Sequence, residues 1–391
     1  MRVLHAAETI QGGIATVLRQ LLAAQTAHDM RQVCLVPDSQ RSEIPNRIGM
    51  MAFRRSGRDL HSFMSFTICL AVIVWRFNPD VVHLHSTFAG CFGRLVLLLL
   101  RPFRQPKVIY CPHGWSFLMK GEGAREYLYA LVERLLAGLS DRIICVSRYE
   151  AGEAAVHGLP ERLIEVVLNG VEPPNDRMQP NPFEAGRINL LYVGRFDYQK
   201  GFDLLEHAMA LLEKAGPFHL TAIGAPVLSG SMPHDRSNIT YTGWLKPHDM
   251  AGYLRHADLL VMPSRWEAFG LVAAEAQSYG LPVVASDCCS LPEIVTEHVT
   301  GRFFRSGCSK SLAELIGSMG AADWHAMRDA AYRSYADNFC SERMCREVSA
   351  VYLRALEGAR TGRRDFLPGR YQSAQRNRNG MRGSEGIQAP E

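Results

Sequence analysis

The segment PSRWEAFGLVAAEA, residues 263–276, follows directly on an apolar run at residues 259–262. The apolar run is typical of a short buried strand, and the small residues from Gly270 onward are typical of a helix. The segment therefore predicts a strand, a loop and a helix start in succession. Units of this kind build parallel sheets whose two faces are covered by helices.

The same alternation of strands and helices extends outward from this segment over most of the chain. Strands are predicted at residues 2–6, 32–36, 81–84, 107–111, 142–146, 164–168, 188–193, 219–223, 239–241, 259–262 and 282–285. Helices are predicted to start near residues 13, 88, 124, 148, 201, 247, 270 and 312, with a last long helix at residues 341–356. The predicted fold class is α/β, with two doubly wound Rossmann-like domains.

A break divides this pattern near its middle. Four prolines fall within residues 172–182, and proline can neither propagate a helix nor sit in a central strand. We therefore predict a first domain at 1–171, a Pro-rich linker at 172–186 and a second domain at 187–340. A C-terminal helix at 341–357 is expected to pack back on the first domain, ahead of a basic tail at 358–391. The carboxyl ends of the two sheets should face a cleft, where ligands bind in such folds.

Composition limits the classes of protein that fit. The chain has 391 residues, 47% of them apolar, which is enough for two ordinary domains. Its formal charge of +4 equals the excess of seven arginines over three acidic residues in the tail, so the rest of the chain is about neutral. The tail lacks periodic apolar positions and is predicted to be disordered. We expect no nucleic-acid partner.

Cysteines and apolar runs exclude some further classes. The ten cysteines include no Cys-x-x-Cys pair, which predicts buried fillers in a reducing compartment and no zinc site. The apolar run at residues 63–77 is shorter than a bilayer span requires, so a buried helix is predicted there. The N-terminus enters a strand at once, which predicts no export signal.

Two loops at strand ends carry residues that suit phosphates. Gly12 and Gly13 follow the first strand and open a helix, so the backbone can approach a ligand closely there. Gly194 and Arg195 end a later strand, and Lys200 precedes the next helix. Two cations around such a turn can receive a diphosphate, arginine through its forked donors and lysine as a point charge.

Two carboxylates flank the helix start in the segment quoted first. Glu267 precedes the helix, and Glu275 lies in its second turn among small apolar neighbours that predict partial burial. Carboxylates accept hydrogen bonds from the neighbouring hydroxyls of a sugar or a ribose. The backbone N–H groups at residues 269–271 can face phosphate oxygens.

Together these motifs resemble the family 4 glycosyltransferases of the GT-B fold. The resemblance rests on Glu-x7-Glu at 267–275, Gly-Arg-x4-Lys-Gly at 194–201 and the glycines of the first loop. Further matches are Val-His-Leu-His at 82–85, Cys-Pro-His-Gly at 111–114, Ile-Cys-Val-Ser at 144–147 and Val-Leu-Asn-Gly-Val at 167–171. The resemblance covers residues 1 to about 356. It implies two Rossmann-like domains that face each other across a cleft, the first binding an acceptor and the second a nucleotide sugar.

The resemblance also implies roles for single residues. Arg195 and Lys200 would bind the donor diphosphate and offset the charge that grows as it leaves. Glu275 would hold the donor ribose. Glu267, with the backbone N–H groups at the helix start, would contact the transferred sugar and the distal phosphate.

On the other side of the cleft, His113 would lie against the donor sugar near its anomeric carbon, and the first loop would close over the phosphates. The implied catalytic residues are His113, Arg195, Lys200 and Glu267. The implied donor-binding residues are Gly12, Gly13, Gly194, Phe269, Gly270, Leu271 and Glu275.

No metal or other cofactor is expected beside the nucleotide sugar, which is a co-substrate. The chain has no Asp-x-Asp, and Arg195 and Lys200 supply the positive charge that a metal would otherwise bring. His83 and His85 would face the same side of a strand, but the sequence shows no third ligand for a metal.

The implied activity is that of a retaining hexosyltransferase. It would transfer a sugar from a UDP- or GDP-sugar to a saccharide or lipid-linked saccharide, with retention of anomeric configuration, in cell-surface polysaccharide or lipopolysaccharide synthesis. Such an enzyme is expected in the cytoplasm, at the inner face of the plasma membrane. Arg94, Arg101, Arg104 and Lys107, interleaved with apolar residues, predict peripheral contact with an anionic membrane.

Other readings of the sequence remain open. A nucleotide-sugar epimerase or hydrolase of the same fold would need no acceptor, and a non-catalytic protein could bind the nucleotide sugar alone. A nicotinamide oxidoreductase is disfavoured because the Gly-x-Gly-x-x-Gly fingerprint is missing. Trp115, Phe117 and Tyr127 either stack on an acceptor or pack in the core.

Overall fold

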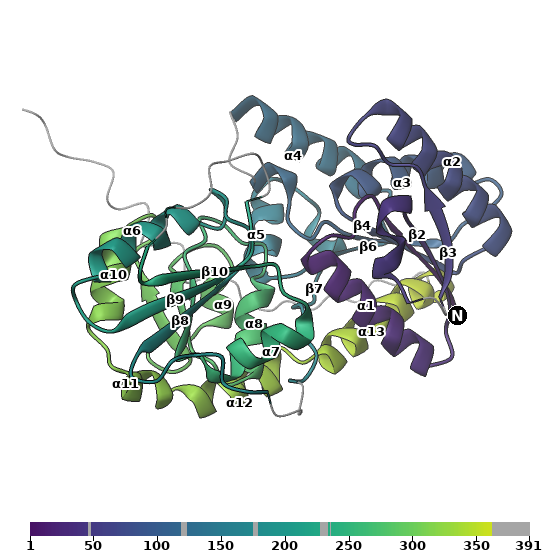
Figure 1. Ribbon diagram of the computed structural model, residues 1–391. Coiled ribbons are helices and arrows are strands. Elements are labelled where there is room, and N and C mark those ends of the chain that lie inside the picture. Colours follow the sequence, from purple (N-terminus) through teal and green to yellow (C-terminus); the bar gives the residue numbers. More distant parts are fainter. Residues whose placement is uncertain (46–47, 119–122, 175–178, 227–233, 235, 362–391) are drawn as a thin grey trace, which may run out of the picture.

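The computed structural model describes the chain except residues 46–47, 119–122, 175–178, 227–233, 235 and 362–391, and except the side chains of residues 358–361. The described chain forms two α/β domains, each built on one parallel sheet with helices packed against it (Figure 1). The predicted tail lies almost wholly outside the described residues, as does most of the loop after Gly224.

The N-terminal domain contains a seven-stranded sheet in the order β3-β2-β1-β4-β5-β6-β7. Its central strands are buried on both faces, as expected for a parallel sheet covered by helices. The strands are β1 Arg2–Ala7, β2 Arg31–Pro37, β3 Gly49–Phe53, β4 Val81–His85, β5 Lys107–Cys111, β6 Arg142–Cys145 and β7 Ile164–Val166. The α-helices are α1 Gly13–Ala27, α2 Leu60–Phe77, α3 Thr87–Leu100, α4 Gly123–Ala137 and α5 Arg148–Val156.

The C-terminal domain contains a six-stranded sheet in the order β10-β9-β8-β11-β12-β13. The strands are β8 Ile188–Val193, β9 Phe218–Ile223, β10 Ile239–Gly243, β11 Leu259–Met262, β12 Val283–Ser286 and β13 Gly301–Phe304. The helices are α6 Phe202–Leu212, α7 Pro247–His256, α8 Leu271–Ser278, α9 Leu291–Ile294, α10 Ser309–Gly317, α11 Ala321–His325 and α12 Arg328–Asn338. In each sheet the strand order reverses once, between β1 and β4 and between β8 and β11, and such switch points hold ligands.

The structure departs from the sequence prediction at several elements. The strands β3 and β13 and the helices α9, α11 and α12 were not predicted, because each is short or lacks a clear apolar period. The predicted buried helix at residues 63–77 is α2, and only one of its faces is buried. Phe66, Leu70 and Val74 lie in the core, whereas Ile68 and Trp75 are exposed. Among the described residues, α2 is the one helix that is long and apolar enough to cross a membrane, and 28% of it is buried.

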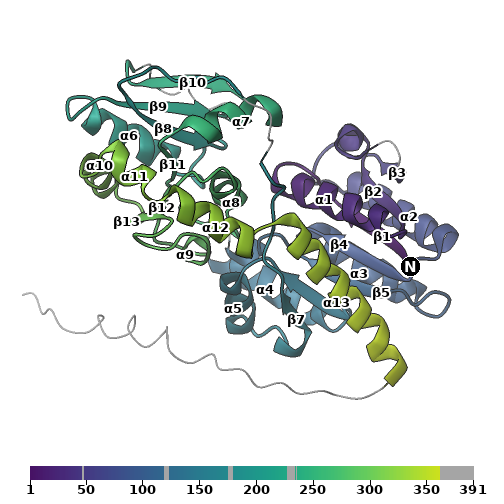
Figure 2. The same cartoon turned by 90° about the horizontal axis from the view of Figure 1, so that it is seen from below.

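The chain passes twice between the domains, and the two passages are hydrogen-bonded to each other. Val171 N donates to Phe339 O at 2.8 Å, and Ser341 N donates to Val171 O at 2.9 Å. After the second passage, α13 (Ser341–Thr361) runs along the N-terminal domain (Figure 2). Its Tyr352 is fully buried, and the Tyr352 hydroxyl lies 2.7 Å from His83 Nδ1 of β4. The last helix therefore completes the core of the first domain.

The two domains also touch at the carboxyl ends of their sheets. Ser147 Oγ, which caps α5, donates to Ala268 O of the other domain at 2.7 Å. Glu293 of α9 accepts hydrogen bonds from Arg148 N and Tyr149 N at the start of α5, at 2.8 and 2.6 Å. A carboxylate at a helix N-terminus is favourable because it meets unpaired N–H groups and the positive end of the helix dipole. These contacts join the two domains at the carboxyl ends of their sheets.

Candidate active site

Lys200 and Glu267 form a largely buried ion pair on the C-terminal domain side of the cleft. Lys200 Nζ lies 2.6 Å from Glu267 Oε1, and Ser264 Oγ donates to the same oxygen at 2.8 Å. Glu267 is only 7% exposed. The loops after β8 and β11 bring the two residues together, although they are 67 positions apart in the chain. A lysine ammonium has three donors, so Lys200 can hold Glu267 and a phosphate oxygen at once.

Arg195 follows β8 in the same loop. Its Nη2 donates to Gln199 Oε1 at 2.7 Å and lies 3.2 Å from Asp197 Oδ2. Asp197 also accepts a hydrogen bond from Lys200 N, so it ties the two cationic residues into one turn. The Arg195 side chain is 41% exposed, so part of it is accessible to a ligand. Gly194, just before it, is held at the sheet edge by a bond from its N–H to Ile223 O.

The helix α8 begins directly behind this pair. Gly270 is its N-cap and has φ 103°, a conformation that residues with a side chain rarely adopt. Ser290 fixes the turn before this helix, because its Oγ lies within hydrogen-bond distance of the carbonyl oxygens of Glu267 and Phe269, at 3.1 and 2.8 Å. The Phe269 ring is buried in the core, so only its backbone is available to a ligand. The loop thus presents the first N–H groups of α8 in a fixed direction.

Glu275 lies one turn further along α8. Burial raises the pKa of its carboxyl to about 7, and the charge of Arg19 on α1 lowers it in part. Within the described part of the chain, no side-chain hydrogen bond to the Glu275 carboxylate is found; only its backbone oxygen accepts one, from Ser278. A desolvated carboxylate of this kind is ready to accept donors from a ligand.

The loop after β1 approaches α8 from the other domain. Gly12 caps α1 with φ 63°, and a Cβ on Gly13 would lie 2.7 Å from Leu271 Cδ1. Because glycine at position 13 has no side chain, the first loop can approach the start of α8 closely. The structure brings Gly12, Gly13, Gly270 and Leu271 to one place, as the resemblance implied, and their role in donor binding stays a prediction.

His113 follows β5 in a strained backbone conformation, with φ 53°. Its neighbour Gly114 is held by a hydrogen bond from its N–H to Glu150 Oε1 at 2.7 Å. A Cβ on Gly114 would lie 3.4 Å from Ala268 Cβ, so the His113 loop meets the segment that carries Glu267. Burial lowers the pKa of the His113 imidazole to about 4, so the ring is neutral at pH 7.

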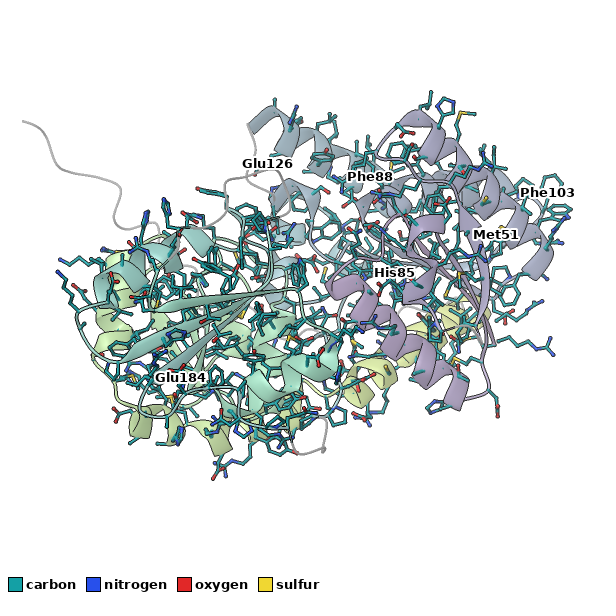
Figure 3. The ribbon with its side chains drawn as sticks, viewed as in Figure 1. Met51, His85, Phe88, Phe103, Glu126 and Glu184 are labelled. Atoms are coloured by element: carbon teal, nitrogen blue, oxygen red, sulfur yellow. The ribbon has the colours of Figure 1, made fainter. Side chains whose placement is uncertain are left out.

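His83 and His85 have a third neighbour that the sequence did not reveal. His5 of β1 is in register with His83 of β4, and ligand atoms of His5, His83 and His85 lie within 4.8 Å of one another. The two strands are far apart in the sequence, so the histidine motif alone could not identify His5. Figure 3 labels His85 on the part of the N-terminal domain that lies nearer the C-terminal domain.

Sequence reasoning missed two carboxylates that shape the site. Glu150 of α5 is fully buried and accepts hydrogen bonds from both Gly114 N and Val146 N, and burial raises its pKa to about 7. Glu293 holds the start of α5 from the other domain. Nothing in the sequence pairs these residues with their partners, although the spacing Ser147-x-x-Glu150 is typical of a helix start.

Some expected surface residues are in the core. Arg94 is fully buried, and its guanidinium lies 2.6 Å from Glu133, so the prediction that it faces a membrane is wrong. Trp115 and Phe117 are each 1% exposed and pack in the core, which removes them as stacking surfaces for an acceptor. Tyr127 is exposed on α4.

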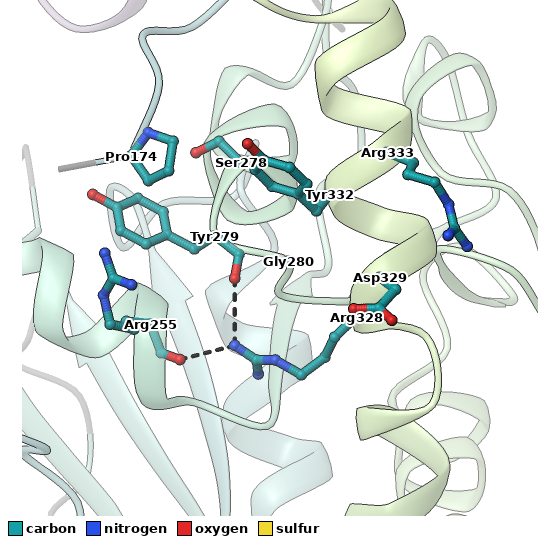
Figure 4. Close-up of a pocket in the computed structure, with 9 residues that line it drawn as sticks. All are labelled: Pro174, Arg255, Ser278, Tyr279, Gly280, Arg328, Asp329, Tyr332 and Arg333. Carbon is teal, nitrogen blue, oxygen red and sulfur yellow. Dashed lines mark hydrogen bonds between the residues drawn. The ribbon is translucent and has the colours of Figure 1, made fainter. Parts of the chain in front are cut away.

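A separate cavity of about 450 Å³ lies away from the cleft, beside α12 and the linker residue Pro174 (Figure 4). Arg328 lines this cavity, and its guanidinium donates hydrogen bonds to the carbonyl oxygens of Arg255 and Ala257. The aromatic rings of Tyr279 and Tyr332 line the same cavity. The Arg328 charge is thus used to join α12 to the domain. Ser278, which lines the cavity, also donates a hydrogen bond to the backbone oxygen of Glu275.

Comparison with known proteins gives a consistent result for both domains. Residues 11–174 match the family described as "Glycosyltransferase Family 4", and residues 187–320 match "Glycosyl transferases group 1". A 41.2 kDa protein of unassigned function from the cps region of Klebsiella pneumoniae is 33% identical, over 90% of this chain and 99% of that protein. D-inositol 3-phosphate glycosyltransferase 1 of Catenulispora acidiphila is 30% identical, over 72% of this chain and 73% of that enzyme.

Solved structures resemble the whole described fold. Sucrose-phosphate synthase from Thermosynechococcus elongatus superposes with a TM-score of 0.78 at 18% identity, over 92% of this chain and all of that chain. Anabaena HepE in complex with UDP and glucose superposes with a TM-score of 0.73 at 17% identity, over 90% of this chain and 99% of that chain. At these identities the likeness concerns the fold.

Proposed function

Because the chain belongs to the group 1 glycosyltransferases, the family 4 enzymes of the two-domain GT-B fold, we propose that it transfers a hexose from a nucleoside diphosphate sugar. The acceptor in this proposal is a saccharide or a lipid-linked saccharide, and the configuration of the anomeric carbon is retained. The likeness to a protein of a cps region, and to HepE bound to UDP and glucose, supports a nucleotide sugar donor and a role in cell-surface polysaccharide or lipopolysaccharide synthesis.

The observation that carries the proposal is the buried Lys200–Glu267 pair behind the start of α8. A diphosphate lying there would meet Lys200, Arg195 and the first N–H groups of the helix. The Glu275 carboxylate, one turn along α8, suits the two hydroxyls of the donor ribose. The His113 loop covers the other side, next to Ala268.

In the proposed reaction, the bond between the anomeric carbon and the diphosphate oxygen breaks as negative charge grows on the leaving group. Arg195 and Lys200 stabilise that charge, which is the largest contribution expected from fixed groups in such a site. The acceptor oxygen bonds to the anomeric carbon on the face that the diphosphate leaves. The proton of the acceptor hydroxyl passes to a diphosphate oxygen, so no side-chain nucleophile is needed.

The test is calorimetric binding of UDP, GDP, ADP and their glucose conjugates to the wild type and to Lys200→Ala. We expect one nucleoside diphosphate to bind at micromolar strength and Lys200→Ala to lose that binding. Lys200→Ala should also lower turnover by about 100-fold or more, as expected when one charge-stabilising group is removed. The matched control is Lys214→Ala, in the exposed turn after α6, which should change neither quantity.

Product analysis separates the proposal from its alternatives. A transferase consumes the donor only when an acceptor is present, and NMR of the product gives its anomeric configuration. An epimerase or hydrolase consumes the donor without an acceptor. If no nucleotide binds, or if folded Lys200→Ala is as active as the wild type, the proposed site is wrong.

We propose further that the reaction needs no metal ion, because Arg195 and Lys200, in one loop, can supply the positive charge that a metal would otherwise bring to the diphosphate. Turnover should then persist in excess EDTA. Loss of turnover in EDTA, with recovery on adding Mg²⁺ or Mn²⁺, would contradict this part of the proposal.

Localisation at the inner face of the plasma membrane is supported by one apolar surface of the N-terminal domain. This surface, here called the α2–α3 face, is formed by exposed side chains of α2 and of the end of α3. They are Leu60, Met64, Ile68, Trp75, Leu98, Leu99 and Phe103. Figure 3 labels Phe103 at the end of the domain far from the C-terminal domain. Clusters of exposed apolar side chains on a folded domain often mark contact with another molecule or a membrane.

Cationic side chains border the α2–α3 face. Arg101 is exposed next to Phe103, and the Arg104 guanidinium lies 4.6 Å from the centroid of the Trp75 ring. Because α2 packs its other face against the domain core, it would lie on a bilayer and not across it.

Sedimentation with vesicles should show stronger binding to phosphatidylglycerol than to phosphatidylcholine. Phe103→Ser should weaken vesicle binding, and Leu211→Ser, at another exposed apolar site on α6, should not.

A further inference from the structure

Three histidines form a hydrogen-bonded chain that ends at the His113 loop. His5 Nδ1 lies 3.0 Å from His85 Nε2, and His85 Nδ1 lies 2.9 Å from His113 Nε2. At the far end, His5 Nε2 lies 3.0 Å from Gln25 Oε1 of α1. The chain therefore runs from α1 through β1 and β4 to the loop after β5. It joins the buried Gln25 amide to a residue at the cleft.

The charge state of the rings limits how this chain can be bonded. Burial lowers the pKa of His5 and of His113 to about 4, and that of His85 well below its ordinary value. The three rings are thus neutral at pH 7, and each has one N–H donor and one bare acceptor nitrogen. In a chain of such rings, fixing the proton at one end fixes it at every ring.

Gln25 sets the direction of the chain. Its carbonyl oxygen faces His5, so His5 carries its proton on Nε2 and donates it to Gln25. The bare Nδ1 of His5 then accepts from His85 Nε2, and the bare Nδ1 of His85 accepts from His113 Nε2. The amide nitrogen of Gln25 lies on the side of the Tyr352 hydroxyl, whose proton can go to His83 Nδ1 at 2.7 Å.

We propose that Gln25, His5 and His85 are positioning residues that hold His113 in the tautomer with its proton on Nε2. The Nδ1 lone pair of His113 is then left as an acceptor at the cleft. Within the described residues His113 Nδ1 has no hydrogen-bond partner. This tautomer, together with the function proposed above on which the inference rests, assigns His113 to accept a hydrogen bond from a hydroxyl of the transferred sugar. In this tautomer it cannot donate a proton to the diphosphate through that nitrogen.

The fold supports the chain at both ends. The strained φ of His113 and the bond from Gly114 N to Glu150 fix where the ring stands. His5 and His85 are each at most 1% exposed, so water does not compete for their nitrogens. Hydrogen bonds in such dry surroundings strengthen one another, and a broken link is costly.

The same cluster could be considered a metal site, and its hydrogen bonds argue against this. Both nitrogens of His5 and both of His85 are used in the chain, so only His83 Nε2 is without a partner among the three rings. An ion at His5, His83 and His85 would break the links that lead to His113. Metal analysis of the purified protein therefore belongs to the test.

The experiment is ¹⁵N NMR of the full chain with ring-labelled histidine, in which protonated and bare ring nitrogens differ in shift and coupling. His113→Gln identifies the His113 signals. We expect the wild type to show a proton on His113 Nε2 and a bare Nδ1. A proton on Nδ1, a rapidly exchanging mixture, or a stoichiometric bound metal would overturn the proposal.

Two pairs of variants test the positioning role. His5→Asn offers a carbonyl oxygen near the place of Nδ1 and should keep the His113 tautomer, whereas His5→Leu removes the acceptor and should give a mixture. Gln25→Met should also give a mixture. Gln20→Met is the same change at a buried position of α1 that lies outside the row of histidines. It should lower stability and leave the His113 tautomer unchanged. His5→Leu and Gln25→Met should lower turnover about tenfold, as expected for one lost hydrogen bond.

The outcomes separate this proposal from the proposed function. The tautomer is measured without substrate, so the NMR result stands even if no transfer is found. If transfer is normal but the tautomer is the same in His5→Leu and in the wild type, the positioning role is wrong and the transferase is not.

Discussion

At the scale of single residues, Glu275 shows how the site differs from an ordinary surface. Its carboxyl is held among the small residues of α8, where burial raises its pKa from 4.5 to about 7. Below pH 4.5 both the folded and the unfolded chain hold this proton. As the pH rises towards 7 the unfolded chain releases it first, so this residue's contribution to stability falls with rising pH in that window.

Glu275→Gln therefore has opposite effects on stability and on binding. The amide stays neutral, so the free variant should be more stable than the wild type at pH 8, by about 1 to 2 kcal/mol. At pH 4 the difference should vanish, because the wild-type carboxyl is then protonated as well. Donor affinity should fall about 10- to 100-fold at pH 8, as expected when a charged acceptor is lost.

Thermal unfolding at the two pH values and calorimetry with a nucleoside diphosphate sugar measure both effects. Comparing the variant with the wild type cancels any titration of the ligand itself. If the variant is less stable at pH 8 and binds donor as well as the wild type, Glu275 is a structural residue.

Residue identities near the cleft could be predicted to different depths. Gly13, Lys200, Glu267 and Gly270 come from short motifs, because a turn, a helix start and a charge are local properties. The hydrogen-bond partners of Glu150 and of His85 cannot be predicted in this way, because they depend on how separate strands meet. A residue whose role is to hold another one leaves no signal in its own neighbourhood.

At the scale of elements, the sequence located the central strands of both sheets within one or two residues. These strands are mostly apolar because they are buried on both faces, and His5, His83 and His85 are exceptions. The edge strand β3 was missed because its side chains are mostly half-buried and its apolar run is short. The exposed face of α2 was missed for a different reason, since an apolar helix in a core and one on a surface have the same composition.

The helix α13 gives a prediction at this scale. Its Val348, Val351, Tyr352 and Ala355 are buried against the N-terminal domain. A chain that ends at residue 340 should lose this cover, because each exposed apolar side chain costs about 1.5 to 3 kcal/mol. We expect it to aggregate or to unfold at much lower temperature than the whole chain.

The matched control is a chain that ends at residue 361, which keeps all of α13. It should have the melting temperature and the donor affinity of the full chain, by calorimetry. A chain ending at 340 that melted like the full chain would show that α13 does not complete the N-terminal core.

At the scale of the whole molecule, two kinds of contact control the cleft. The paired passages at Val171 and Ser341 are two segments that are hydrogen-bonded to each other between the domains. The bonds from α5 to Glu293 and Ala268 close the far side. Closing contacts of this type commonly assemble the site around the substrate and exclude water.

Glu293→Gln should shift the molecule towards an open arrangement. The amide keeps one oxygen but loses the charge that favours the start of α5. In solution scattering the free variant should have a larger radius of gyration than the wild type. Saturating donor should remove the difference if donor binding closes the cleft. Glu297→Gln, beyond α9 and paired within its own domain, is the control. Equal radii for the Glu293 variant and the wild type would mean that this contact does not hold the cleft.

The passage of the chain back to the first domain has a consequence for its synthesis. A ribosome makes the strands of the N-terminal sheet first, but the helix that covers β4 and β5 appears only after the entire second domain. At about 5 to 20 residues per second, the wait is on the order of 10 to 40 s. During that time the newborn first domain presents an uncovered apolar surface. We therefore expect a chaperone that binds exposed apolar surface to hold this domain until α13 has been translated.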